Sequence, residues 1–167
     1  WLLLAVMAGS LLLLSSGCTE KPEPTVGGIV MPHHLLVEHE IRDFLEEIIS
    51  QRESSTVQRI ILLSPNHFGY GYNNIQSTNE NIGTFFETLP LDTETIQQLA
   101  DTSPLAIEPI DFPKEHGISV PAAFLKEVFP DATMVPITLK FGTSERDLNQ
   151  LLAAIETLDL SQTLIVA

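Results

Sequence analysis

The sequence lacks features that several classes of protein require. Its one cysteine, Cys18, has no partner for an internal disulfide bond. Lysine and arginine together number 8 against 22 aspartate and glutamate residues, which gives a net charge of −14. Nucleic-acid backbones and anionic lipid surfaces both require clustered basic residues, so this charge argues against either as a partner. The chain has no internal repeat and no low-complexity segment.

One long hydrophobic run is present, from Trp1 to Leu14. It is short for a transmembrane span but has the length of the apolar region of a secretory signal. The Ser-Ser-Gly that precedes Cys18 resembles the end of a bacterial lipoprotein signal. We therefore predict a signal peptide at 1–17 with an incomplete N-terminus, and a cell-envelope lipoprotein anchored to the membrane by lipidation of Cys18, on the periplasmic or extracellular face. An uncleaved membrane anchor is the alternative.

Residues 18–26 are polar and contain prolines, as in a tether, and residues 27–167 have the length of one domain. Apolar runs alternate with segments of helical spacing, which predicts a three-layer α/β domain with a mostly parallel central sheet and helices on both faces. The last apolar run ends the chain, so we expect the domain to be truncated at the C-terminus. Strands are expected at 28–31, 59–63, 105–110, 134–139 and 163–167, and helices at 38–51, at 93–100, from about 119 and from 143.

The strand expected at Arg59–Leu63 organises this sheet. It contains four consecutive apolar residues without alternation, which is typical of a strand covered on both faces. Ser64-Pro65-Asn66 should end it and present His67 at the carboxyl edge of the sheet, where α/β sheets bind ligands. The region 68–90 is rich in Gly, Asn and Thr, and we expect a long irregular loop there.

Two histidines, His33 and His67, each follow a strand and a proline. Imidazoles that converge at a sheet edge commonly hold a transition metal, although a histidine that caps a strand or packs in a loop fits this spacing equally well. His34 should point away from them, because successive residues after a strand tend to face opposite directions. His39 lies among charged residues of an expected helix, and we predict that it is solvated.

A third imidazole and a carboxylate come from a separate polar segment, at His116 and Glu115. Two histidines with one carboxylate form the pattern of non-haem Fe(II) sites, and three such ligands with a water equally suit catalytic zinc. The candidate metal ligands are therefore His33, His67 and His116. The candidate catalytic residues are His116, as an alternative general acid or base, and Glu115.

Several segments resemble the motifs of the Memo family in order and spacing. The family motifs are P-H-A-G-Y, G-P-S-H, T-P-L and E-H-S-I-E, and the corresponding segments here are Pro32-His33, Leu63–His67, Thr88–Asp92 and Glu115–Ser119. The resemblance covers about residues 27 to 167, and bacterial members are often described as protein B of the AmmeMemoRadiSam system. It implies a cleft able to hold metal and a fold shared with class III extradiol dioxygenases, whose Fe(II) is held by two histidines and a glutamate.

The resemblance implies that His33 and His67 are metal-site residues and that His116 is a further histidine of the cleft. The chain departs from the motifs at His34, which stands in place of alanine, and at Gly117, which stands in place of serine. We therefore expect a Memo-like metal-binding redox protein or a non-haem-iron-type oxidoreductase, with Fe, Cu or Zn as the metal. The alternatives are a non-catalytic module that binds a small ligand or a protein in the cleft, and a zinc hydrolase.

Overall fold

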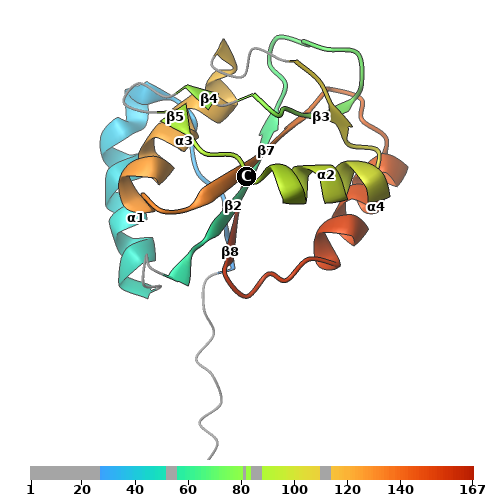
Figure 1. Cartoon of the computed structure of the whole chain (residues 1–167). Coiled ribbons are helices and arrows are strands. Elements are labelled where there is room, and N and C mark those ends of the chain that lie inside the picture. Colours follow the sequence, from blue (N-terminus) through green and yellow to red (C-terminus); the bar gives the residue numbers. More distant parts are fainter. Residues whose placement is uncertain (1–26, 52–55, 81, 84–87, 110–113) are drawn as a thin grey trace, which may run out of the picture.

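The structure is a computed structural model that describes residues 27–51, 56–80, 82–83, 88–109 and 114–167 (Figure 1). Within these ranges, one sheet has the strand order β1-β8-β2-β7-β3-β6, and every neighbouring pair in it is parallel except β3 with β7. β4 and β5 form a separate antiparallel pair. The strands are β1 (Gly28–Ile29), β2 (Arg59–Pro65), β3 (Ile75–Ser77), β4 (Ile82–Gly83), β5 (Thr88–Leu89), β6 (Ala106–Ile107), β7 (Thr133–Leu139) and β8 (Thr163–Val166).

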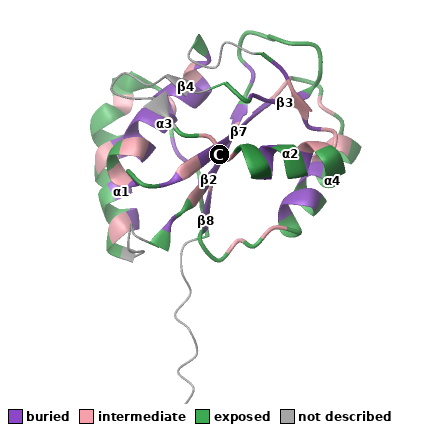
Figure 2. Cartoon of the chain, viewed as in Figure 1, coloured by how far each residue is buried: buried purple, intermediate pink, exposed green. Residues whose placement is uncertain are grey.

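Helices cover both faces of the main sheet (Figure 1). They are the 3-10 helix η1 (Leu35–Val37) and the α-helices α1 (Glu38–Gln51), α2 (Thr93–Thr102), α3 (His116–Val128) and α4 (Glu145–Glu156). α1 and α3 share one hydrophobic core with the sheet, and α2 and α4 share the core on its other face. Figure 2 shows the buried residues concentrated on the strands and on the helix sides that face them. The predicted three-layer α/β domain with a mostly parallel sheet is therefore confirmed.

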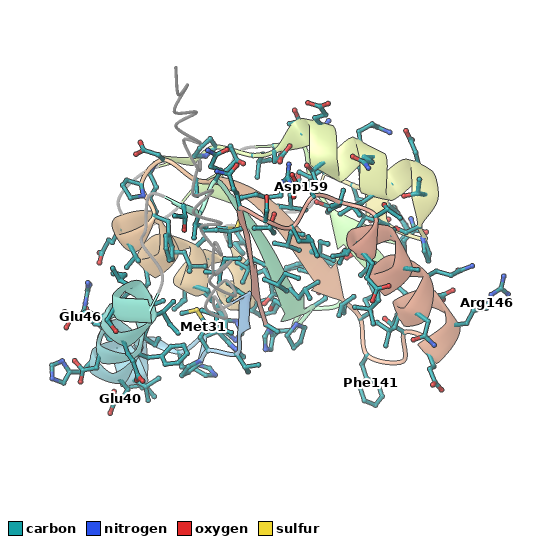
Figure 3. All side chains as sticks on the ribbon, turned by 90° about the horizontal axis from the view of Figure 1, so that it is seen from below. Met31, Glu40, Glu46, Phe141, Arg146 and Asp159 are labelled. Atoms are coloured by element: carbon teal, nitrogen blue, oxygen red, sulfur yellow. The ribbon has the colours of Figure 1, made fainter. Side chains whose placement is uncertain are left out.

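The spacing of apolar residues in α1 determines which side of this helix packs on the sheet. Ile41, Leu45 and Ile48 are buried, and their three- and four-residue spacing places them on one side. Glu40 and Glu46 point away from the domain (Figure 3). Each buried aliphatic side chain contributes about 1.5–3 kcal/mol, which exceeds the helix propensity of any single residue, so packing is what holds α1 in place.

β2 extends to Pro65, beyond its predicted end at Leu63. Pro65 lies opposite Leu139 of β7, whereas pairing of β2 with β8 reaches only Leu62. The Asn66 amide donates to the Leu139 carbonyl, so the proline nitrogen faces the other edge of β2, beyond the end of β8. The proline therefore interrupts no ladder hydrogen bond, and for this reason the predicted stop is wrong.

The region 68–90, expected to be irregular, contributes β3 to the main sheet. Its residues Ile75, Gln76 and Ser77 are all buried. Ser77 Oγ donates to the carbonyl oxygen of Pro136 at 2.7 Å, so a polar side chain of β3 is satisfied inside the sheet layer. No apolar run marks this strand in the sequence, and hydrophobic periodicity therefore does not reveal it.

α3 begins at His116, earlier than the start predicted near Ser119. Glu115 is its N-cap, and the Glu115 carboxylate accepts a hydrogen bond from the Gly117 amide at 3.2 Å. Pro121 consequently lies inside the helix rather than in its first turn. The earlier start places His116 on a rigid element, where a polar segment between elements was expected.

The predicted signal peptide at 1–17, the lipidation site Cys18 and the tether at 18–26 lie outside the described residues. Within the part of the chain that the structure describes, no helix combines the length and the hydrophobicity needed to cross a membrane. β1 is shorter than the strand predicted at 28–31, although the Met31 amide still pairs with the Ala167 carbonyl beyond it. β6 is shorter than the strand predicted at 105–110, of which residue 110 lies outside the described residues.

Candidate metal centre

Three parallel strands bring His33 and His67 to the same edge of the sheet. His33 follows β1 and His67 follows β2, with β8 between them. Because the three strands are parallel, their carboxyl ends share this edge. The Met31 amide donates to the Ala167 carbonyl at 2.9 Å, which continues the pairing past the end of β1. As a result, the ring centroids of His33 and His67 are 4.9 Å apart.

His67 is held by the carboxylate of Glu115, which is only 1% exposed. Oε2 of Glu115 accepts from the His67 amide at 2.9 Å, and Oε1 lies 2.6 Å from His67 Nδ1. Because a carboxylate can only accept at this distance, the proton of a neutral His67 lies on Nδ1. The lone pair that could bind a metal ion is then on Nε2. Glu115 therefore fixes both the orientation and the tautomer of the His67 ring.

α3 approaches the end of β2 so closely that position 117 has no room for a side chain. A Cβ on Gly117 would lie 2.0 Å from Ser64 Oγ and 3.0 Å from His67 Cε1. Both separations are shorter than van der Waals contact, so a larger residue would displace the side chains around it. Gly117 thus allows the N-terminus of α3 to bring Glu115 within hydrogen-bonding distance of His67.

The His116 ring lies beside that of His67, with centroids 4.1 Å apart, and 5.5 Å from that of His33. Its Nδ1 is 3.8 Å from Glu115 Oε1, which is too long for a hydrogen bond. Burial, followed by the neighbouring His67, lowers the pKa of His116, and the same two causes lower the pKa of His33. Both rings are therefore held toward the neutral form, in which imidazole binds metal ions.

His34 joins the cluster, so the prediction that it points away is wrong. Its ring centroid lies 5.0 Å from that of His33 and 5.3 Å from that of His116. Side chains alternate within a paired strand, whereas His33 and His34 lie beyond β1 and directly before η1. His39 is exposed on α1 and belongs to neither of the metal-capable groups found among the described residues.

The donor atoms of the cluster fall into two groups that share His116. One group contains His33, His34 and His116, and the other contains His67, Glu115 and His116. Within each group the donor atoms lie within 4.8 Å of one another. Ligands of one ion are on the order of 3–4 Å apart, so small side-chain rotations would bring either group to ligand distance. Imidazoles with one carboxylate fit Fe, Cu or Zn, and the assignment of His33, His67 and His116 as ligands stays a prediction.

Apolar side chains surround the histidines. Phe68 stacks on Tyr70 with centroids 5.4 Å apart and meets the His116 ring edge-on at 5.8 Å. Both aromatic side chains are exposed. A pocket of about 360 Å³, within the range of small-molecule sites, is lined by His33, His34, Leu35, Leu36, His116 and Val120.

The loop that carries these aromatic residues is anchored by the buried side chain of Asn66. This side chain accepts from the Tyr70 amide at 3.1 Å and donates to the Tyr70 carbonyl at 2.9 Å. It also donates to Oε1 of the buried Gln76 in β3, at 2.8 Å. A buried amide left unpaired costs about 1–3 kcal/mol, so this network favours one conformation of the loop.

Glu108, directly after β6, anchors the same loop from the neighbouring strand. Its carboxylate accepts from the amides of Tyr72 at 2.8 Å and Asn73 at 2.9 Å. Gly71 has φ +74°, and a Cβ there would lie 2.2 Å from Glu108 Oε2. Burial alone would raise the pKa of Glu108, but hydrogen bonds from Asn73 and Tyr72 outweigh burial and the pKa is lowered. Sequence reasoning missed these anchors, because isolated polar residues in an expected loop carry no sign of burial.

The chain matches the model of one protein family, described as Memo-like protein, over residues 13–167. That range includes every histidine of the cluster. A MEMO1 family protein of Caldivirga maquilingensis is 34% identical over 80 residues, which are 47% of this chain. The match covers 28% of the relative, so the similarity to this protein concerns less than a third of its length.

Proposed function

Because the chain belongs to the Memo-like protein family, we propose that it is a metal-binding protein whose histidine cluster performs Lewis-acid or redox chemistry. In this proposal His33 and His67 are metal ligands, and His116 is a third ligand or a general acid or base. The metal is Fe, Cu or Zn, which all accept imidazole nitrogen.

The observation that carries the proposal is the contact of His67 with Glu115, 2.6 Å between Nδ1 and Oε1. A carboxylate that accepts the Nδ1 proton orients a metal-binding histidine and raises its basicity. A purely structural pair would explain why Glu115 caps α3, but it would not explain three more imidazoles within ring contact of one another. Metal binding accounts for both features.

A bound metal would supply Lewis acidity or electron transfer, and the residues of the chain would direct that chemistry. Glu115 keeps the Nε2 of His67 available by holding the Nδ1 proton. The lowered pKa of His116 leaves it able to accept a proton from a substrate near neutral pH. Phe68, in edge contact with His116, reduces the access of water to that ring.

Metal analysis and Zn²⁺ titration of the purified protein test the proposal. We expect metal in protein purified without added metal, and a Zn²⁺ affinity after chelator treatment that falls about 100-fold or more in His67→Ala. Glu115→Gln should lower the affinity by about 10–100-fold, through the orientation of His67. His39→Ala, on the exposed side of α1, is the matched control and should bind as the unaltered protein does. Equal affinity in His67→Ala would contradict the proposed ligand.

A non-catalytic binding module is the second candidate, and the pocket beside the cluster favours it. Such a module would capture a small apolar ligand through Leu35 and Leu36 whether or not metal is bound. Binding of a fluorescent apolar probe that survives chelator treatment, together with metal-free protein after purification, would support this candidate over the first.

We also propose that the protein is exported and lipid-anchored at Cys18, which the apolar run before it supports. Cells grown with a fatty-acid probe should label the protein, and Cys18→Ser should abolish the label. Unlabelled protein in the soluble cytoplasmic fraction would contradict the anchor.

A further inference from the structure

His34 is a member of the cluster that the ligand set proposed above does not use. Its backbone is extended, with φ −117° and ψ 131°, and its carbonyl accepts from the Val37 amide at 3.1 Å as η1 begins. Its side chain makes no capping hydrogen bond with this helix. The turn into η1 therefore uses the backbone of His34 and not its side chain. Other contacts must determine where the imidazole points.

The rings of His33, His34 and His116 form a nearly equilateral triangle. The centroid separations are 5.0 Å, 5.3 Å and 5.5 Å. An ion at the centre of such a triangle would lie roughly 3 Å from each centroid, which matches a Zn–N bond of about 2 Å plus the radius of an imidazole ring. One donor atom from each ring already lies within 4.8 Å of the other two. The spacing therefore suits one ion bound by three imidazoles.

We propose that His33, His34 and His116 form a three-imidazole metal position in this chain, which shares His116 with the donor group that contains Glu115 but includes no carboxylate. The inference rests on the proposed function, because His33 and His116 also belong to the ligand set given there. Three neutral nitrogen donors without a carboxylate favour Zn²⁺ or Cu²⁺ over Mg²⁺, Ca²⁺ or Mn²⁺, which prefer oxygen.

An apolar pocket lies beside this position. The same three histidines line the pocket of about 360 Å³, and the rest of its lining is Leu35, Leu36 and Val120. The surface of this pocket is apolar, so it adds no donor atom to the three imidazoles, and any further ligand would be water or a small molecule. The His34 position therefore depends on the three imidazoles alone.

Titration of the full chain after chelator treatment, with Zn²⁺ and Co²⁺ as probes, tests the role of His34. His34→Ala removes the imidazole while keeping the backbone that begins η1. We expect its Zn²⁺ affinity to fall about 100-fold or more. The visible absorption of bound Co²⁺ should lose the intensity that is typical of four-coordinate Co²⁺. The Mn²⁺ affinity should change less than the Zn²⁺ affinity. His39→Ala should leave all three unchanged, and far-UV circular dichroism checks that each variant is folded.

The outcomes separate this inference from the proposed function. Equal Zn²⁺ affinity in His34→Ala and the unaltered protein overturns the His34 position, while a loss in His67→Ala still supports the proposed ligands. The reverse result, with binding lost in His34→Ala and retained in His67→Ala, supports the His34 position and contradicts the use of His67. His34→Gln keeps a polar side chain without an imidazole and should weaken Zn²⁺ binding as His34→Ala does. A chain that binds no Zn²⁺ at all overturns both.

Discussion

The two ends of the sheet use their polar residues in different ways. At the amino ends of β2, β7 and β8, a cavity of about 620 Å³ is lined by groups that pair with one another, with Arg59 Nε 2.6 Å from Asp92 Oδ2. At the carboxyl ends, four imidazoles converge beside a smaller pocket of about 360 Å³. The larger cavity is built from interactions that stabilise the fold, and the smaller one lies beside imidazoles whose rings contact one another. On this difference we place the proposed site at the carboxyl end rather than in the larger cavity.

The largest effect on stability is expected at the amino end, from Asp92→Ala. Asp92 caps α2 and accepts from the Thr95 amide at 3.0 Å. Loss of the cap together with the partner of the partly buried Arg59 should lower the free energy of unfolding by about 2–4 kcal/mol. Chemical denaturation measures this loss. Zn²⁺ affinity should not change, because the imidazoles lie at the other end of the sheet, and a parallel loss of affinity would break the comparison.

A smaller loss of stability, combined with weaker metal binding, is expected from Gly117→Ala at the carboxyl end. Overlap of the new Cβ with Ser64 Oγ and the His67 ring should lower the free energy of unfolding by about 1–3 kcal/mol. The higher helix propensity of alanine offsets about 1 kcal/mol of this loss. Displacement of His67 should lower Zn²⁺ affinity as well.

The double variant Gly117→Ala/Ser64→Ala separates the two consequences of that overlap. Removal of Ser64 Oγ relieves the closest contact, so stability should recover. The contact of 3.0 Å with His67 Cε1 remains, so Zn²⁺ affinity should stay reduced. Recovery of both in denaturation and titration experiments would show that Gly117 has no part in positioning His67.

The smallest effect is the pH dependence of the imidazole cluster at the carboxyl end in metal-free protein. Burial and neighbouring imidazoles lower the pKa of His33 and His116 below the ordinary value of 6.5. The unfolded chain then binds protons more readily than the folded one, so stability falls as the pH drops below about 6.5. The pKa values of the carboxyl groups of Asp92 and Glu108 are also lowered. Their protonation reduces stability only near and below pH 3.8 and 4.5, respectively.

Thermal melts of chelator-treated protein between about pH 7.5 and 5.5 measure the upper of these two windows. The melting temperature should decrease across it, and the double variant His33→Asn/His116→Asn should reduce that decrease. The carboxyl groups of Asp92 and Glu108 serve as an internal control, since they stay ionised throughout this range. A melting temperature that is independent of pH in the unaltered protein would contradict the assignment.

Local patterns were sufficient for the elements that carry their own signal. α1 was predicted over its full length from its apolar spacing, and β2 from its unbroken apolar run. The histidines at 33, 67 and 116 were identified because each is near a break in such a pattern. β3, the extension of β2 to Pro65 and the direction of His34 depend instead on neighbours distant in sequence. A strand whose polar residues are satisfied by other strands has no periodicity of its own to detect.

The anchoring of the loop by Asn66 and Glu108 would affect the thermodynamics of binding for any ligand that packs on this loop. Amides at Tyr72 and Asn73 that donate to a buried carboxylate should exchange slowly with solvent deuterium, because exchange requires the loop to open. A ligand that packs on Phe68 therefore meets a surface that is ordered before it arrives. Little conformational entropy is lost by the protein on association, and the entropic cost falls mainly on the ligand.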